Sequence, residues 1–209
     1  MKIQLGFGSA LLLTSLIISN NFVFAIIYIL CATAHEIGHL LAAKLLNIKI
    51  SKLTLDFAGA KIIPSGEISS YQSEFLLCAA GPVTSFTLCA LTFFILRKSG
   101  VVLDFSNILA YIDNPELSRN CILILIFIFS IVQGGINLIP ISGFDGGRML
   151  ASATYYVFGT RAGHAISKIM TFLFAFFLWL ISVYFLIRVG QGLSLFSFSL
   201  CLFLKILEE

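Results

Sequence analysis

The chain has 209 residues, of which 59% are apolar and 11% are charged, and its formal net charge is +3. Soluble domains carry about 25% charged residues, so this composition and a mean hydropathy of +1.03 indicate an integral membrane protein. The small net charge, with no basic patch interleaved with aromatic residues, excludes nucleic acid as the expected partner. The cysteines show no paired spacing and are expected to be small buried apolar residues: Cys31, Cys78, Cys89, Cys121 and Cys201.

Apolar segments predict six transmembrane helices, since a helix needs about 20 apolar residues to cross a bilayer. The segments are residues 5–18, 22–46, 75–96, 120–139, 169–187 and 193–206. No long polar linker divides them, so we expect one domain over residues 1–209. The expected fold class is an all-α polytopic membrane protein, lying in the lipid bilayer, with a small β-hairpin on the cytoplasmic side.

The loop charges predict the orientation of these helices. Nine of the 13 Lys and Arg residues fall on one side of the six-helix arrangement, and the rest fall on the other: Arg97, Lys98, Arg119 and Arg188. Cytoplasmic loops carry the excess of positive charge. We therefore expect both termini in the cytoplasm. His164, with Arg161 and Lys168, is expected in a loop at the inner surface.

The second apolar segment contains His35-Glu36-Ile37-Gly38-His39. Two imidazoles one helical turn apart face the same way and can hold one zinc ion, and Glu36 can take a proton from a water that the metal activates. Ionisable groups at membrane depth are costly and usually mark function. Helix histidines satisfied without a metal are the alternative. Cys31, one turn before His35, could line the site but is not expected to be a ligand.

Residues 50–68 differ from the apolar segments. Ile50, Leu53, Leu55 and Phe57 form a partly alternating run that leads into a turn containing Gly59. This pattern predicts a β-hairpin, with an amphipathic surface loop as the alternative. If the hairpin has a free edge, an unwound substrate could pair with it as an added strand. Gly59 is therefore a candidate substrate-binding residue.

A third metal ligand is needed, because catalytic zinc usually has three protein ligands and a water. Asp145 follows the fourth segment at the end that holds the histidines, and Pro140 breaks the helix before it. Gly146 and Gly147 are expected to let the backbone turn, so that the carboxylate faces inward. A surface aspartate in a loop is the alternative. Asn137 and Gln133, one turn apart, form a polar stripe nearby.

Taken together, these motifs resemble the site-2 protease family of intramembrane zinc metalloproteases. The resemblance covers about residues 22–150 and extends to the branch that includes the stage IV sporulation protein FB. It is carried by the zinc motif, Ala80-Gly81-Pro82, Asn137-x-x-Pro140 and Asp145-Gly-Gly.

The resemblance implies one Zn²⁺ per chain held by His35, His39 and Asp145, with Glu36 as the catalytic base. Asn137 matches a position near the substrate path, where its amide could stabilise the oxyanion, and a helix–helix hydrogen bond is its alternative role.

The same resemblance implies a bacterial cell-membrane enzyme of regulated intramembrane proteolysis. Its substrate would be a membrane-anchored or membrane-associated protein, such as a pro-sigma factor in sporulation, and an inhibitory membrane partner is left open. Members of this branch carry a nucleotide-binding CBS domain after the last helix, whereas the printed sequence ends at Glu209. Control by a nucleotide is therefore not expected.

Two other functions are compatible with a histidine pair in a membrane. Relatives of the prenyl-protein proteases supply a glutamate as the third zinc ligand, but Glu67, Glu74 and Glu116 are expected in or beside loops. A zinc transporter or a non-catalytic zinc-binding membrane protein would not need Glu36, and transporters usually show paired polar breaks in corresponding halves. A Glu36→Gln variant separates these functions from a protease.

Overall fold

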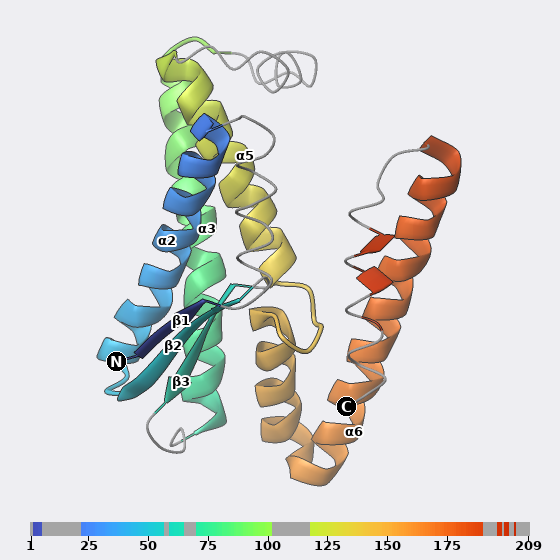
Figure 1. Ribbon diagram of the computed structural model, residues 1–209. Helices are drawn as coiled ribbons and strands as arrows, with labels where there is room; N and C mark the ends of the chain where they lie inside the picture. The colour runs from blue at the N-terminus through green and yellow to red at the C-terminus, as the bar shows by residue number, and fades with distance from the viewer. Residues whose placement is uncertain are drawn as a thin grey trace. The chain divides into compact units, whose positions relative to one another are not determined.

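The computed structural model describes residues 2–5, 22–56, 59–64, 70–101, 118–189, 196–197, 199–200 and 203. Within this part of the chain, four helices are long and apolar enough to cross a membrane. They are α2 (Phe22–Leu45), α3 (Tyr71–Lys98), α5 (Arg119–Asn137) and α6 (Asp145–Val189), shown in Figure 1. The chain forms two compact units, the first of Met1–Ser69 with Leu76–Asn137 and the second of Ser70–Phe75 with Leu138–Glu209.

The hydropathy pattern located the described helices well. The predicted segments 22–46, 75–96 and 120–139 correspond to α2, α3 and α5 within a few residues, and segment 169–187 is the later part of α6. The predicted segments 5–18 and 193–206 fall almost entirely outside the described residues. The number of membrane crossings therefore stays a prediction.

In the first unit, small residues bring α2 and α3 together. A side-chain carbon built at Gly38 of α2 would overlap the Thr84 hydroxyl of α3 and lie 2.7 Å from the Ala80 carbonyl oxygen. Such close approach of backbones replaces hydrophobic burial as the source of helix association in a lipid environment. On α5, Gly134 similarly leaves room for α3, since a side-chain carbon built at Gly134 would lie only 3.2 Å from the Ser85 side-chain carbon. The helix that carries the histidines is thus held closely against α3.

A three-stranded sheet belongs to the same unit. Strand β2 (Ile50–Asp56) pairs antiparallel with β3 (Gly59–Pro64), where the sequence predicts a hairpin, and β1 (Lys2–Leu5) pairs parallel with β2. Gly59 begins β3 opposite Asp56, so it lies in a strand and not in the turn. Residues 57–58, between the two strands, are outside the described residues.

The order of the strands decides which strand of the hairpin can have a free edge. The order β1-β2-β3 makes β2 the central strand, so β2 has no edge for a substrate. Strand β1 escaped prediction because four residues are too few to show a strand periodicity, and its pairing with β2 joins distant parts of the chain. Of the two hairpin strands, β3 is paired on one side only among the described strands, so its outer edge is the hairpin edge open to a further strand.

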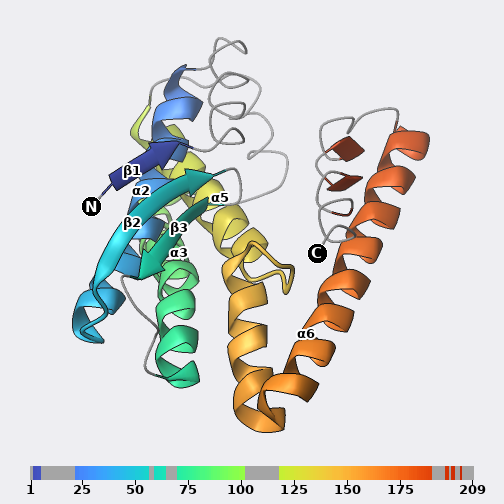
Figure 2. The same ribbon diagram turned by 60° about the horizontal axis from the view of Figure 1, so that its bottom comes forward.

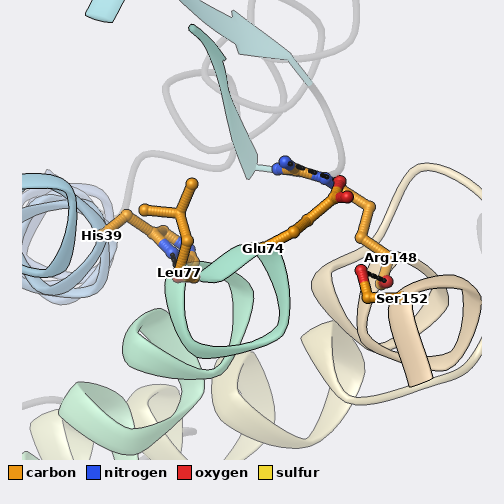
Figure 3. Close-up of polar contacts among 5 residues, drawn as sticks. All are labelled: His39, Glu74, Leu77, Arg148 and Ser152. Atoms are coloured by element: carbon orange, nitrogen blue, oxygen red, sulfur yellow. Dashed lines mark hydrogen bonds and ion pairs between the residues drawn. The ribbon is translucent and has the colours of Figure 1, made fainter. Parts of the chain in front are cut away.

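The second unit is organised by α6, which turns sharply in Figure 2, and its helical geometry is interrupted at Gly159. Gly159 has φ 76°, a left-handed conformation that glycine adopts without steric cost. Residues 145–158 fall between two predicted segments and form the first part of α6, and His164, which was expected in a loop, lies in the second part. Glu74 and Arg148 form an ion pair at 3.5 Å in this unit (Figure 3).

Candidate metal centre

The zinc motif lies on α2 with its polar side chains turned away from the surface. His35 and His39 are only 1% and 3% exposed, and Glu36 is also buried. The two Nε2 atoms lie 3.3 Å apart, so both imidazoles direct the same nitrogen to one point. This is the arrangement that the spacing of one helical turn predicts.

The other nitrogen of each imidazole is held by α3. His39 donates its Nδ1–H to the Leu77 carbonyl oxygen at 2.8 Å (Figure 3), and His35 Nδ1 lies 2.9 Å from the Ser85 hydroxyl. A carbonyl only accepts, so this bond places the proton of His39 on Nδ1 and leaves the lone pair on Nε2. Metal-binding histidines are usually oriented by such second bonds. The sequence offered no signal for Ser85, because its role depends on the packing of α3 against α2.

Gly81 of α3 provides the space in front of the histidines. A side-chain carbon built at this residue would overlap Nε2 of both His35 and His39. Glycine is therefore required by the close approach of the α3 backbone to the imidazoles, and this gives a physical reason for the glycine of Ala80-Gly81-Pro82. The sequence marked Gly81 only through family resemblance.

Asp145 is the first residue of α6 and is buried. His35, His39 and Asp145 are positioned to bind a metal ion, since one ligand atom of each lies within 4.8 Å of the others. Two imidazole nitrogens and a carboxylate oxygen suit zinc and leave a fourth position for water or substrate. The donor set therefore fits the metal that the motif predicts.

Gly146 and Gly147, after Asp145, do not form the backbone turn that the sequence predicts. Gly146 and Gly147 are helical, and a side-chain carbon at either would overlap a backbone carbonyl, of Leu138 and Ile141 respectively. They allow α6 to begin tightly against the preceding loop. The backbone turn before Asp145 comes instead from Gly143, with φ 103°.

The other candidate residues lie in different environments. Asn137 is buried, and its Nδ2 donates to the Gln133 carbonyl oxygen at 3.1 Å, a bond within α5 and not between helices. Cys31 lies between Ser130, whose hydroxyl is 3.7 Å from its sulfur, and the Ile126 carbonyl at 3.9 Å. The structure does not group Cys31 with the metal-binding residues. Glu74 pairs with Arg148.

We predict that Ser85→Ala weakens zinc binding by about 10- to 100-fold, the usual cost of losing a bond that orients a ligand. The reason is that His35 Nδ1 loses its partner at 2.9 Å. Zinc affinity is measured by competition with a chelator. Thr87→Ala is the control, since among the described residues the exposed Thr87 hydroxyl on the same helix bonds only the Val83 carbonyl. Equal affinities in both variants would show that Ser85 does not position His35.

Comparisons with known proteins agree with this geometry. The family model described as Peptidase family M50 matches residues 22–181. A zinc metalloprotease of Methanocaldococcus jannaschii is 28% identical over 142 residues, which are 64% of this chain and 36% of the relative. The chain thus spans about a third of the length of that curated relative.

A solved structure gives a likeness over nearly the whole chain. The site-2 protease from Methanocaldococcus jannaschii superposes with a TM-score of 0.69 at 21% identity, covering 99% of this chain and 89% of that one. At this identity the likeness concerns the fold.

Proposed function

This chain belongs to Peptidase family M50, and from that premise we propose that it is an intramembrane zinc metalloprotease. It hydrolyses a peptide bond in or near the membrane segment of a membrane-associated protein. The observation that carries the proposal is the buried pair of Nε2 atoms, 3.3 Å apart, with Glu36 beside them in the same motif. A site that only stored zinc would have no need of this carboxylate.

We assign the proton transfers to Glu36. Zinc, when bound by His35, His39 and Asp145, would polarise the peptide carbonyl and lower the pKa of a water toward about 7. Glu36 accepts the proton of the attacking water and then donates it to the leaving amide nitrogen. The bonds from α3 to both Nδ1 atoms keep the imidazoles in the orientation that this chemistry needs.

Asn137 is proposed to lie along the substrate path. Its Nδ2 donates one hydrogen to the Gln133 carbonyl oxygen, and the amide has a second N–H that can donate to a substrate oxygen. Loss of an oxyanion donor usually costs about 10²–10³ in kcat. A much smaller loss in Asn137→Ala would assign this residue to the helix alone.

The substrate has to expose its scissile bond. A membrane helix satisfies its own backbone hydrogen bonds, so local unwinding must come first. The outer edge of β3 is our candidate docking strand for the unwound segment, since β3 contacts α2, which carries His35 and Glu36. Gly59 begins this strand. Strand addition would satisfy the backbone groups that unwinding exposes.

The finer assignments come from resemblance and loop charge. We propose a single protease domain in a bacterial cell membrane with both termini in the cytoplasm, and a pro-sigma factor as one substrate class. The alternative, a non-catalytic zinc-binding membrane protein or a zinc transporter, uses the same metal ligands but predicts no cleavage.

We expect a strong zinc chelator to abolish cleavage of a membrane-anchored test substrate, and added Zn²⁺ to restore it. The reason is that the metal ligands are preserved when the ion leaves, because α3 holds both imidazoles. Substrate cleavage is followed on gels in detergent or in vesicles. Cleavage that persists after the chain has been shown free of zinc would contradict a metalloprotease.

A further inference from the structure

The second unit contains a pocket of about 220 Å³ at the turn of α6. Its wall is built by one face of each part of the helix. Gly147, Ala151 and Tyr155 line it from the first part, at intervals of four residues, while His164, Lys168 and Thr171 line it from the second. The two parts of α6 meet at a sharp turn (Figure 2), so both parts can line the same pocket.

The lining of the pocket is cationic and rich in hydrogen-bond donors. Arg148 and Lys168 contribute positive charge, and hydroxyls come from Ser142, Ser167 and Thr171. Residues 146–189 contain no Asp or Glu, so α6 beyond its first residue supplies no neutralising charge. Charged and hydroxyl donors of this kind suit a phosphate oxygen.

The basic groups keep capacity for a ligand. Arg148 pairs with Glu74 through one nitrogen at 3.5 Å, both side chains are partly exposed, and a guanidinium has five N–H donors. Lys168 has no carboxylate partner among the residues that the structure describes. His164 Nδ1 lies 3.3 Å from the Tyr155 hydroxyl, which holds the ring at the pocket wall.

The position along α6 indicates a membrane interface. Tyr156 and Phe158, beside the turn, are exposed, and Arg161 follows it. Aromatic and basic side chains gather where a membrane helix meets the headgroups. From Ile169 onward α6 is almost wholly apolar.

We propose that this pocket binds the phosphate group of an anionic membrane lipid. Its volume is below the roughly 300–1,000 Å³ of pockets for drug-sized ligands, so it suits a headgroup whose acyl chains remain in the bilayer. The lipid joins the two parts of α6, because its phosphate bonds Arg148 of the first part and Lys168 of the second. This role is independent of the proposed protease activity.

The test measures lipid retained by the purified full chain after exposure to mixed micelles of phosphatidylglycerol and phosphatidylcholine, by native mass spectrometry. The wild type is expected to retain more phosphatidylglycerol than phosphatidylcholine. Lys168→Gln should lower this retention at least about tenfold, because a hydrogen bond between a cation and the phosphate inside the pocket is lost. A His164→Gln/Lys168→Gln variant should lower it further, while zinc content stays that of the wild type.

Arg161→Gln is the matched control, since Arg161 is a nearby exposed basic residue of α6 that does not line the pocket. Its retention should remain within about twofold of the wild type, because the charge it removes lies outside the pocket. Equal losses in Arg161→Gln and Lys168→Gln, or no loss in Lys168→Gln, would overturn the proposal.

A parallel experiment adds inorganic phosphate to the lipid-bound protein. Displacement of phosphatidylglycerol by millimolar phosphate would assign the pocket to the free anion and overturn the lipid as its occupant.

Discussion

Glu36→Gln is expected to lower cleavage by at least about 10²–10⁴-fold, the range that a positioned general acid–base contributes. The substitution keeps the shape of a buried side chain and removes its ability to accept a proton. Zinc per chain should remain that of the wild type, since Glu36 is not one of the three residues positioned to hold the ion. Cleavage of a membrane-anchored substrate and zinc content are measured on the same preparation.

Glu74→Gln is the matched control for this prediction. It also neutralises a carboxylate, but in a partly exposed ion pair with Arg148, and such pairs contribute little to stability. Its cleavage rate should stay close to that of the wild type. Retained cleavage in Glu36→Gln would remove Glu36 from the mechanism, whereas loss of zinc together with cleavage would give it a structural role.

Gly81→Ala is expected to weaken zinc binding by more than about 100-fold, beyond the usual cost of losing an orienting bond. The added methyl group would overlap Nε2 of both His35 and His39, so at least one imidazole must turn away. Helix propensity acts in the opposite direction, because alanine in a helix interior is favoured over glycine by about 0.5–1 kcal/mol. A loss of zinc would therefore report the site and not the helix.

Gly135→Ala provides the comparison, since a side-chain carbon at Gly135 of α5 would meet no atom of another described segment within 4 Å. This variant should bind zinc as the wild type does. Both variants are first checked for helix content and for thermal unfolding in detergent. Normal zinc affinity in Gly81→Ala would mean that the metal does not lie between the two Nε2 atoms.

Local patterns in the sequence were sufficient to predict part of the fold and part of the metal site. A run of apolar residues determines a membrane helix, so α2, α3 and α5 could be located, and the spacing of His35 and His39 gave the shared direction of their imidazoles. The family assignment is confirmed by the match over residues 22–181. The closer likeness to the sporulation branch stays a prediction.

Features that depend on packing between distant segments could not be predicted. Ser85 and Gly81 contact the histidines only because α3 packs closely on α2. Strand β1 exists through its pairing with β2, about 50 residues away in the sequence. The first part of α6 contains Gly146, Gly147 and several hydroxyl residues, so it lacks the hydropathy of a membrane segment and is absent from the predicted segments.

Zinc content of the detergent-purified chain, wild type beside Asp145→Ala, tests the central claim most directly. We expect about one zinc per chain in the wild type and loss or marked weakening in the variant, because removal of the carboxylate leaves two protein ligands. A folded wild type without zinc, or full zinc retention in Asp145→Ala, would contradict the three-ligand site.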